Sequence, residues 1–539
     1  VANLQDQLGA YISEGRFPKA GRSLEQKIRE ANAFLEQHLG NRTVAGVGAS
    51  AAVVYKDQVV LSKGYGLRQS NDSSSHVTTS TLFQIGSVTK TFIALGIAAL
   101  VDDGNVTWRD PVIQHLPTLK LFDKYAEKYV TIGDLLSMNS GLGRVLDVPW
   151  LGFGQYPTDK DLVFALRDVD PPHKLRSEYD YANANFAILG ELIESVTGLE
   201  WDEFIKQRIL EPLGMTRTFA SALAVKDDKD MSSGHYSCRG EVLGPYHLVT
   251  SPEAQLVPGG SLKTAAGSVV SSSDDMAKLM RLLLNKGSVD GVEVLKTPQL
   301  VTDMTSGKTP SSAEFAGYFA KDGHHFVADG NTLAAGYGFD FITHGSWGHA
   351  YYDKGGDTVL HHTRSGFAPD EKLGVVIMIN SHLPGDGFLE GHMRSYVMGV
   401  FLDVPKDILD FSFETWRRED QQTPSVPGIP ACGLNFWKDP KVLSLDPKEE
   451  AALVGVYVAQ DSPEFYGSIE ITQTTGSNTG LQMRGGKSSG KLSFVADLGG
   501  DQGKAFLWSA VSFPMLITIS ANASGKYGIA GFGIIFSQQ

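Results

Sequence analysis

The chain has 539 residues, of which 42% are hydrophobic and 20% are charged, with a formal net charge of −14 and a pI of about 5.5. This composition is ordinary for a soluble globular protein, and the length predicts more than one domain. An acidic surface repels phosphate groups, which argues against a nucleic-acid partner. Since no run of about 18 or more apolar residues occurs, no membrane span is predicted.

The chain begins Val-Ala-Asn without methionine, as expected after removal of a signal peptide. N-glycosylation sequons begin at Asn41, Asn71, Asn105 and Asn522. They favour a secreted or extracytoplasmic glycoprotein. The two cysteines, Cys238 and Cys432, form either one disulfide or two unrelated buried thiols, and their spacing leaves both alternatives open.

Residues 1–45 are predicted to be a helical lead-in, because 24–39 place apolar groups at helical spacing. Two strands are predicted at 48–55 and 59–66. The intervening turn at 56–58 would join them as a hairpin. The hairpin opens a main domain that we expect to span residues 46–402.

Helices are predicted to dominate from Ser87 to about Leu223, including one over 183–197 that Gly198 would end. After a further helix at 276–284, strands return at 336–341 and 373–380. Because strands precede and follow the helices, early and late strands would have to pair in one antiparallel sheet. The predicted fold class is therefore α+β: an antiparallel sheet flanked by helices, plus an all-helical subdomain.

Residues 403–447 are rich in proline and are predicted to be a linker. From 448 to 539, short alternating runs are separated by Gly, Ser and Asn. These runs lie at 454–458, 468–472, 481–484, 492–495, 505–508, 515–519 and 529–536. The pattern predicts a small C-terminal β-barrel or sandwich.

The sequence Ser87-Val88-Thr89-Lys90 lies where a short β-like run meets a long apolar helix. Residues three apart on a helix share a face, so the Ser87 hydroxyl and the Lys90 amine can meet. A serine hydroxyl needs a base to act as a nucleophile. A lysine can be that base if burial or nearby positive charge lowers its pKa.

Two more motifs follow in the order that a lysine-assisted serine hydrolase would need. In Tyr181-Ala182-Asn183, a tyrosine hydroxyl can relay a proton and an amide can orient an acyl group. In Lys354-Gly355-Gly356-Asp357, a cation can hold a substrate carboxylate, and the glycines would let the backbone approach the substrate. The backbone N–H groups of Ser87 and Asp357 could form an oxyanion hole.

These motifs resemble those of the serine β-lactamase and penicillin-binding-protein superfamily, on its class C side. Further stretches carry the resemblance: 83–90, 131–142, 179–186, 211–215 and 258–262. The resemblance covers roughly residues 45 to 400. It implies that Ser87 is the acylated nucleophile, Lys90 its base partner and Tyr181 the proton relay. It also implies that Asn183 positions the acyl group and that Lys354 belongs to the third motif.

Some relatives carry histidine-x-glycine as the third motif, so His361 or His362 could take the place of Lys354. The histidine pairs also suggest a metal site, but adjacent strand residues point to opposite faces. We therefore expect no metal and no cofactor.

The leading prediction is a secreted serine hydrolase with a covalent acyl-enzyme intermediate, acting on an ester, lactone, amide or D-amino-acid peptide bond of a small molecule or peptide. The resemblance favours an esterase or peptidase. An acyltransferase, a true β-lactamase and a non-catalytic ligand-binding relative remain alternatives. The sequence determines neither the natural substrate nor the oligomeric state.

Overall fold

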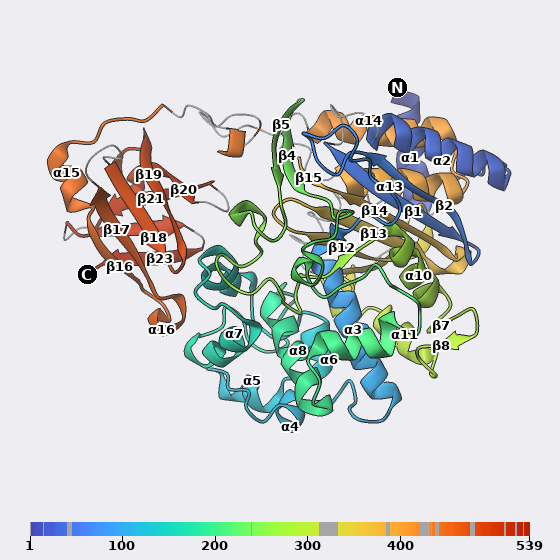
Figure 1. Ribbon diagram of the computed structural model, residues 1–539, viewed down its shortest axis with the longest axis horizontal. Helices are drawn as coiled ribbons and strands as arrows, with labels where there is room; N and C mark the ends of the chain where they lie inside the picture. Colours follow the sequence, from blue (N-terminus) through green and yellow to red (C-terminus); the bar gives the residue numbers. More distant parts are fainter. Residues whose placement is uncertain are drawn as a thin grey trace.

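The computed structural model describes residues 2–539 except 15, 40–45, 239, 312–332, 384–388, 421–431, 433, 437–440, 475–479, 511–513, 523–524 and 532. Figure 1 shows a body built of a sheet and helices, with a separate β-domain at its side. Among the described residues, no helix has the length and apolarity to cross a membrane.

The central sheet has eight strands in the order β2-β1-β14-β13-β12-β11-β10-β9. Every neighbouring pair in it is antiparallel. Its strands are β1 (Gly48–Tyr55), β2 (Gln58–Gly66), β9 (Thr309–Pro310), β10 (Ala334–Ala335), β11 (Phe341–Ser346), β12 (His349–Asp357), β13 (His362–Ala368) and β14 (Leu373–Ile379). The early strand β1 pairs with the late strand β14, which confirms the predicted α+β class.

Every residue of β1 is buried. Because successive side chains point to opposite sides of the sheet, both faces of β1 must be covered. Ala51 and Val53 join one hydrophobic cluster, whereas Ala52 and Val54 join the other. The first cluster is covered by α2 (Leu24–Leu39), α13 (Leu389–Phe401) and α14 (Lys406–Asp420). On the other face, α10 (Ser273–Leu284) packs against β1 and β14.

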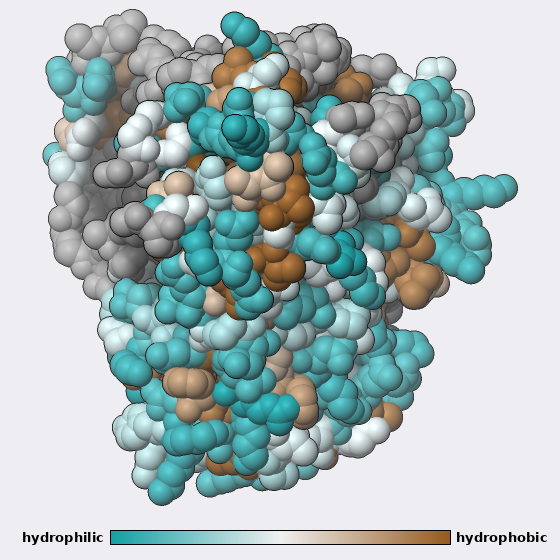
Figure 2. Space-filling view, turned by 90° about the vertical axis from the view of Figure 1, so that its left-hand side faces the viewer, coloured by the Kyte–Doolittle hydropathy of each residue, from teal (hydrophilic) through white to brown (hydrophobic). Residues whose placement is uncertain are grey.

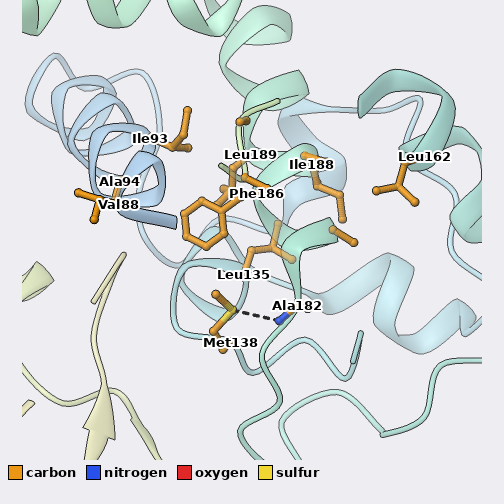
Figure 3. Packing of buried hydrophobic residues seen from close by; sticks show 14 of the residues in the cluster. Val88, Ile93, Ala94, Leu135, Met138, Leu162, Ala182, Phe186, Ile188 and Leu189 are labelled. Carbon is orange, nitrogen blue, oxygen red and sulfur yellow. Dashed lines mark hydrogen bonds between the residues drawn. The ribbon is translucent and has the colours of Figure 1, made fainter. Parts of the chain in front are cut away.

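The helices between β2 and β4 (Gly234–Cys238) form a second body below the sheet (Figure 1). They are α3 (Thr89–Asp102), α4 (Val112–His115), α5 (Lys124–Tyr129), α6 (Ile132–Leu136), α7 (Asp159–Ala165), α8 (Asn183–Thr197) and α9 (Trp201–Ile205). Helix α8 has the predicted bounds and ends at Gly198, whose φ of 73° suits a left-handed cap. Figure 3 shows Phe186 of α8 pointing toward Val88 and Ala94, which places the start of α8 beside the start of α3.

A smaller sheet has the order β15-β4-β5, with strands β4 (Gly234–Cys238), β5 (Glu241–Tyr246) and β15 (Ser381–His382). Cys238 at the end of β4 forms a disulfide with Cys432. Phe436, four residues further on, packs in the same small cluster as Tyr236. The disulfide therefore attaches the segment that leads to the C-terminal β-domain to β4, and it settles the alternative that the spacing left open.

The C-terminal β-domain is a closed barrel in which each strand pairs with the next and β23 returns to β16. Its strands are β16 (Gly455–Ala459), β17 (Ser468–Thr474), β18 (Gly480–Gly485), β19 (Ser488–Asp497), β20 (Lys504–Ala510), β21 (Pro514–Ala521), β22 (Tyr527–Gly531) and β23 (Ile534–Gln538). This confirms the predicted small barrel. Seen from the barrel side, the surface is mostly hydrophilic with small hydrophobic patches (Figure 2).

Three sequence predictions need correction. Residues 336–340 turn instead of extending, since Gly338 has a φ of 79°, and only Phe341 of the predicted strand lies in β11. The run 529–536 is divided between two strands, with Gly533 at a φ of 74° between them. The first part of the predicted linker is helix α14, which begins directly after Pro405.

The disulfide generates a prediction about stability. It joins cysteines 194 residues apart, so removing it should lower the free energy of unfolding by up to about 5 kcal/mol through the entropy of the unfolded chain. The C238S/C432S variant should unfold at a lower temperature than the wild-type protein with its disulfide intact. Added reductant should lower the unfolding temperature of the wild type and leave the variant unchanged. Equal wild-type curves with and without reductant would contradict the prediction.

Candidate active site

Ser87 lies in the short 3₁₀ turn Gly86–Val88, directly before α3. The turn lies directly against the sheet at Asp357. Gly86 has a φ of 51°, and a Cβ at this position would lie only 2.6 Å from the backbone nitrogen of Asp357. Only glycine permits this approach. Ser87 is half-buried, whereas every residue from Val88 to Leu100 is buried. The hydroxyl is therefore the accessible end of an otherwise enclosed element.

Lys90 lies one helical turn from Ser87, and its side chain is fully buried. Its Nζ is 2.9 Å from Ser87 Oγ and 2.6 Å from Asn183 Oδ1, and it also contacts the carbonyl oxygen of Ala266. A neutral amine has two N–H groups and one lone pair. The two carbonyl oxygens can accept both N–H groups, which leaves the lone pair facing the Ser87 hydroxyl.

The surroundings of Lys90 favour this neutral form. Burial lowers the pKa of Lys90 well below its ordinary value, and the positive charge of Lys354 lowers it further. Asp340 and Asp147 act in the opposite direction without reversing the shift. The amine next to the candidate nucleophile is thus suited to accept a proton.

Tyr181 completes the hydrogen bonding of the hydroxyl. Its own hydroxyl donates to Ser87 Oγ at 2.8 Å and accepts from Lys354 Nζ at 3.3 Å. Burial raises the pKa of Tyr181, and the nearby Lys354 offsets this only in part. Tyr181 is therefore a neutral phenol at ordinary pH, able to pass a proton along a chain of hydrogen bonds.

Lys354 on β12 is as buried as Lys90, but it has an anionic partner. Its Nζ donates to both carboxylate oxygens of Asp340 at 2.6 Å. Burial alone would lower the pKa of Lys354, yet the Asp340 carboxylate, together with Tyr181, outweighs burial and the pKa is raised. Lys354 consequently keeps its charge and supplies the positive field beside Lys90 and Tyr181.

Asn183 begins α8 and connects Lys90 to an acidic residue. Its Oδ1 faces Lys90, and its Nδ2 donates to Asp147 Oδ2 at 2.8 Å. A carboxylate only accepts, so it orients the amide with nitrogen toward Asp147 and oxygen toward Lys90. Burial raises the pKa of Asp147 to about 6, so it is mainly ionised at neutral pH.

The last residues of β12 lie against the Ser87 turn. The Thr358 N–H donates to the His361 carbonyl, so Asp357 and His362 form a non-hydrogen-bonded pair in the alternating antiparallel ladder. The Asp357 N–H therefore points away from β13, toward Gly86 and Ser87. Together with the Ser87 N–H, which lies in the turn directly before α3, it can serve as an oxyanion hole.

The two glycines of the third motif have different surroundings. A Cβ at Gly356 would lie 1.9 Å from the Ile85 carbonyl oxygen and 2.9 Å from the Ser87 nitrogen, whereas one at Gly355 would meet the Arg364 side chain at 3.5 Å. Gly356 thus permits close packing of two backbones. That both glycines serve the approach of a substrate stays a prediction.

The neighbouring histidines lie apart from the Ser87 hydroxyl. His361 is buried, and its Nδ1 accepts from the Gln84 N–H. His362 Nδ1 contacts Asp357 Oδ1 at 2.7 Å. Of the alternatives for the third motif, the structure places Lys354 against Tyr181 and gives both histidines other partners.

Asp357, His362 and Glu390 bring three possible ligand atoms within 4.8 Å of one another in the part of the chain that the structure describes. Arg364 already contacts both carboxylates, at 2.6 Å for Asp357 and 3.3 Å for Glu390. A guanidinium that neutralises two acids leaves them poor ligands for a cation. The cluster is best described as an ion-pair network that fixes the Asp357 side chain.

Sequence reasoning missed Asp340, Asp147 and the Ala266 carbonyl. Asp340 and Asp147 lie outside the three motifs, and each reaches its partner only through the tertiary fold. The Ala266 contact is made by backbone, which carries no side-chain signal. The one sequence cue was the isolated charge of Asp340 within the apolar stretch 333–342.

Two curated proteins are similar to about half of this chain. Protein flp of Staphylococcus aureus is 27% identical over 286 residues, which are 53% of this chain and 55% of that protein. Unguisins hydrolase ungD' of Aspergillus campestris is 31% identical over 247 residues, 44% of each chain. The chain spans about half the length of the curated relatives it matches.

Two solved structures share the fold. An octameric penicillin-binding protein homologue from Pyrococcus abyssi covers 95% of this chain and all of its own, with a TM-score of 0.55 and 20% identity. A D-stereospecific amidohydrolase from Streptomyces covers 68% of this chain and 97% of its own, with a TM-score of 0.50 and 21% identity.

The beta-lactamase family model matches residues 25–394, well over half of the chain. This match confirms the resemblance seen in the motifs. The chain belongs to the beta-lactamase family.

Proposed function

We propose that the protein is a serine hydrolase that forms a covalent acyl-enzyme on Ser87. The observation that carries this proposal is the buried Lys90 amine, whose lone pair faces the Ser87 hydroxyl at 2.9 Å. The family match and the name of the unguisins hydrolase support a hydrolytic reaction.

In the acylation step, Ser87 Oγ attacks the carbonyl carbon of the substrate while its proton moves to Lys90 Nζ. The electron pair of the carbonyl bond moves to oxygen. The N–H groups of Ser87 and Asp357 stabilise that negative charge. Each such donor contributes roughly 3–4 kcal/mol in other hydrolases.

The tetrahedral intermediate then collapses and expels the leaving group. The leaving group receives the proton from the Lys90 ammonium through the Tyr181 hydroxyl, which is hydrogen-bonded to Ser87 Oγ. Water attacks the acyl carbon while Lys90 accepts its proton. The bond between that carbon and Ser87 Oγ then breaks, Oγ takes the proton back from Lys90, and the acid product leaves. Lys354 remains charged throughout and helps to orient Tyr181.

We infer an ester or amide substrate rather than a β-lactam. The closed barrel after the main domain supports this choice, because such a module is unusual for stand-alone β-lactamases and resembles those of related esterases and peptidases. The D-stereospecific amidohydrolase with the same fold is compatible with it. Fold similarity alone carries this part of the proposal.

We also infer an extracytoplasmic location. The Cys238–Cys432 disulfide is typical of oxidising compartments. Of the four sequon asparagines, Asn71, Asn105 and Asn522 are exposed, and Asn41 lies outside the described residues.

The proposed nucleophile generates the first prediction here. S87A should lower turnover by about 10³-fold or more, because the variant lacks the hydroxyl that forms the acyl-enzyme. It should also abolish labelling by a fluorophosphonate probe, measured by peptide mapping. S195A, a serine on the exposed end of α8, is the control and should keep wild-type labelling. Labelling of S87A at the wild-type rate would contradict the proposal.

The pKa of Lys90 generates a second prediction. Only neutral Lys90 accepts the Ser87 proton, so kcat/KM should fall as pH decreases through the Lys90 pKa, at a pH well below the ordinary lysine range. Replacing Lys354 removes a charge that lowers this pKa, so K354M should move the fall to higher pH. An unchanged midpoint in K354M, in a variant that remains folded, would exclude Lys90 as the titrating base.

The substrate class is tested with a panel of p-nitrophenyl esters, D-alanyl amides and nitrocefin. We expect turnover of esters or amides to exceed turnover of nitrocefin. Strong hydrolysis of nitrocefin without esterase or amidase activity would instead identify a β-lactamase. S87A serves as the blank for each substrate.

A further inference from the structure

The amine of Lys90 is oriented by a short relay of side chains. Asn183 Oδ1 accepts from Lys90, and Asp147 accepts from the other end of the same amide. The second oxygen of Asp147, Oδ1, is buried without a hydrogen-bond partner among the described residues. A buried carboxylate oxygen without a hydrogen-bond partner lowers the stability of the fold. Asp147 is therefore not placed here to stabilise the fold, and its hydrogen bond to Asn183 needs another explanation.

Asp147 directly precedes a π-helical turn, Val148–Gly152, and the residue after this turn packs against the barrel. Phe153, which follows it, is 1% exposed, with its ring 6.0 Å from that of Trp508 on β20 and 6.4 Å from that of Phe536 on β23. A residue of the main domain thus packs among the interior aromatic residues of the barrel.

The barrel turn between β18 and β19 holds the backbone of the same segment. The Lys487 and Ser488 N–H groups both donate to the Phe153 carbonyl, at 2.7 Å and 3.2 Å. The Ser488 hydroxyl donates to the Gly152 carbonyl at 2.8 Å. Because both strands of this turn belong to the closed barrel, the turn is a rigid support for residues 152–153.

The same turn contacts a second loop that leads to Lys90. Lys487 Nζ donates to the Gly259 carbonyl at 3.1 Å. Seven residues later, the Ala266 carbonyl accepts from Lys90 Nζ. One barrel turn therefore contacts two segments next to Lys90: the 147–153 segment, whose Asp147 binds Asn183, and the loop that continues to the Ala266 carbonyl.

We propose that the barrel is a positioning domain for the active site: its turn at 485–488 fixes the 147–153 segment so that Asp147 orients Asn183, and Asn183 orients the Lys90 amine toward Ser87. Asp147 is a positioning residue in this scheme. The proposal rests on the proposed function, since it assigns the barrel a role in the same acylation step.

Gly486 allows a specific test, because its φ is 54° and a Cβ there would lie 2.5 Å from the Phe153 carbonyl oxygen. Gly500, in another part of the barrel, has a φ of 52° and nothing within 4 Å of a Cβ. G486A and G500A therefore carry the same backbone strain. They differ in whether the new methyl group displaces the 147–153 segment.

The experiment measures the rate of Ser87 acylation, kcat, KM and thermal unfolding for G486A, G500A, D147N and G486A/D147N. G486A should lower acylation and kcat about tenfold with KM within about twofold, while G500A stays within twofold of wild type. D147N should lower kcat about tenfold. The double variant should also lose about tenfold rather than a hundredfold, because both changes break one relay.

Several results would overturn the proposal. These are equal rates for G486A and G500A, or multiplied losses in the double variant. If G486A does not fold, S488A removes only the bond to Gly152, and its smaller loss should likewise vanish in the D147N background; an additive loss rejects the proposal. Absence of any acylation of Ser87 in the wild type would instead reject the proposed function, so the two failures are distinguishable.

Discussion

The site depends on keeping a lysine amine neutral beside a serine hydroxyl. Water would protonate an exposed lysine, so the amine must be removed from solvent. The fold achieves this by burying the Lys90 side chain of α3 completely and by placing a second cation, Lys354, nearby. Among the described residues, the hydrogen-bond partners of Lys90 are a hydroxyl, an amide oxygen and a backbone carbonyl, and none is a carboxylate.

This requirement explains features of the fold that are remote in sequence. Lys354 reaches the site because β12 lies inside the central sheet, in which the late strand β14 pairs with the early strand β1. Its last residues can touch the Ser87 turn only because Gly86 and Gly356 leave space for two backbones. The long apolar helix α3 then provides the buried environment in which the amine loses its proton.

The parts of the site that could be predicted from sequence are those that depend on local geometry. Ser87 and Lys90 are brought together by one helical turn, and the alternation of the C-terminal segments predicts a barrel. Asp340 and Asp147 could not be predicted, because their contacts depend on tertiary packing. The stretch 336–341 was mistaken for a strand because its apolar and aromatic residues have strand propensity, whereas Gly338 adopts a φ of 79°.

The contrast between the two buried lysines shows how a fold assigns different roles to one residue type. Both side chains are fully buried, so desolvation lowers the pKa of each. Only Lys354 has a carboxylate, Asp340, at hydrogen-bond distance, and this reverses the shift of its pKa. One amine is then a base and the other a permanent cation. Asp340 is the foremost of the groups that raise the pKa of Lys354, so the division of roles depends chiefly on that carboxylate.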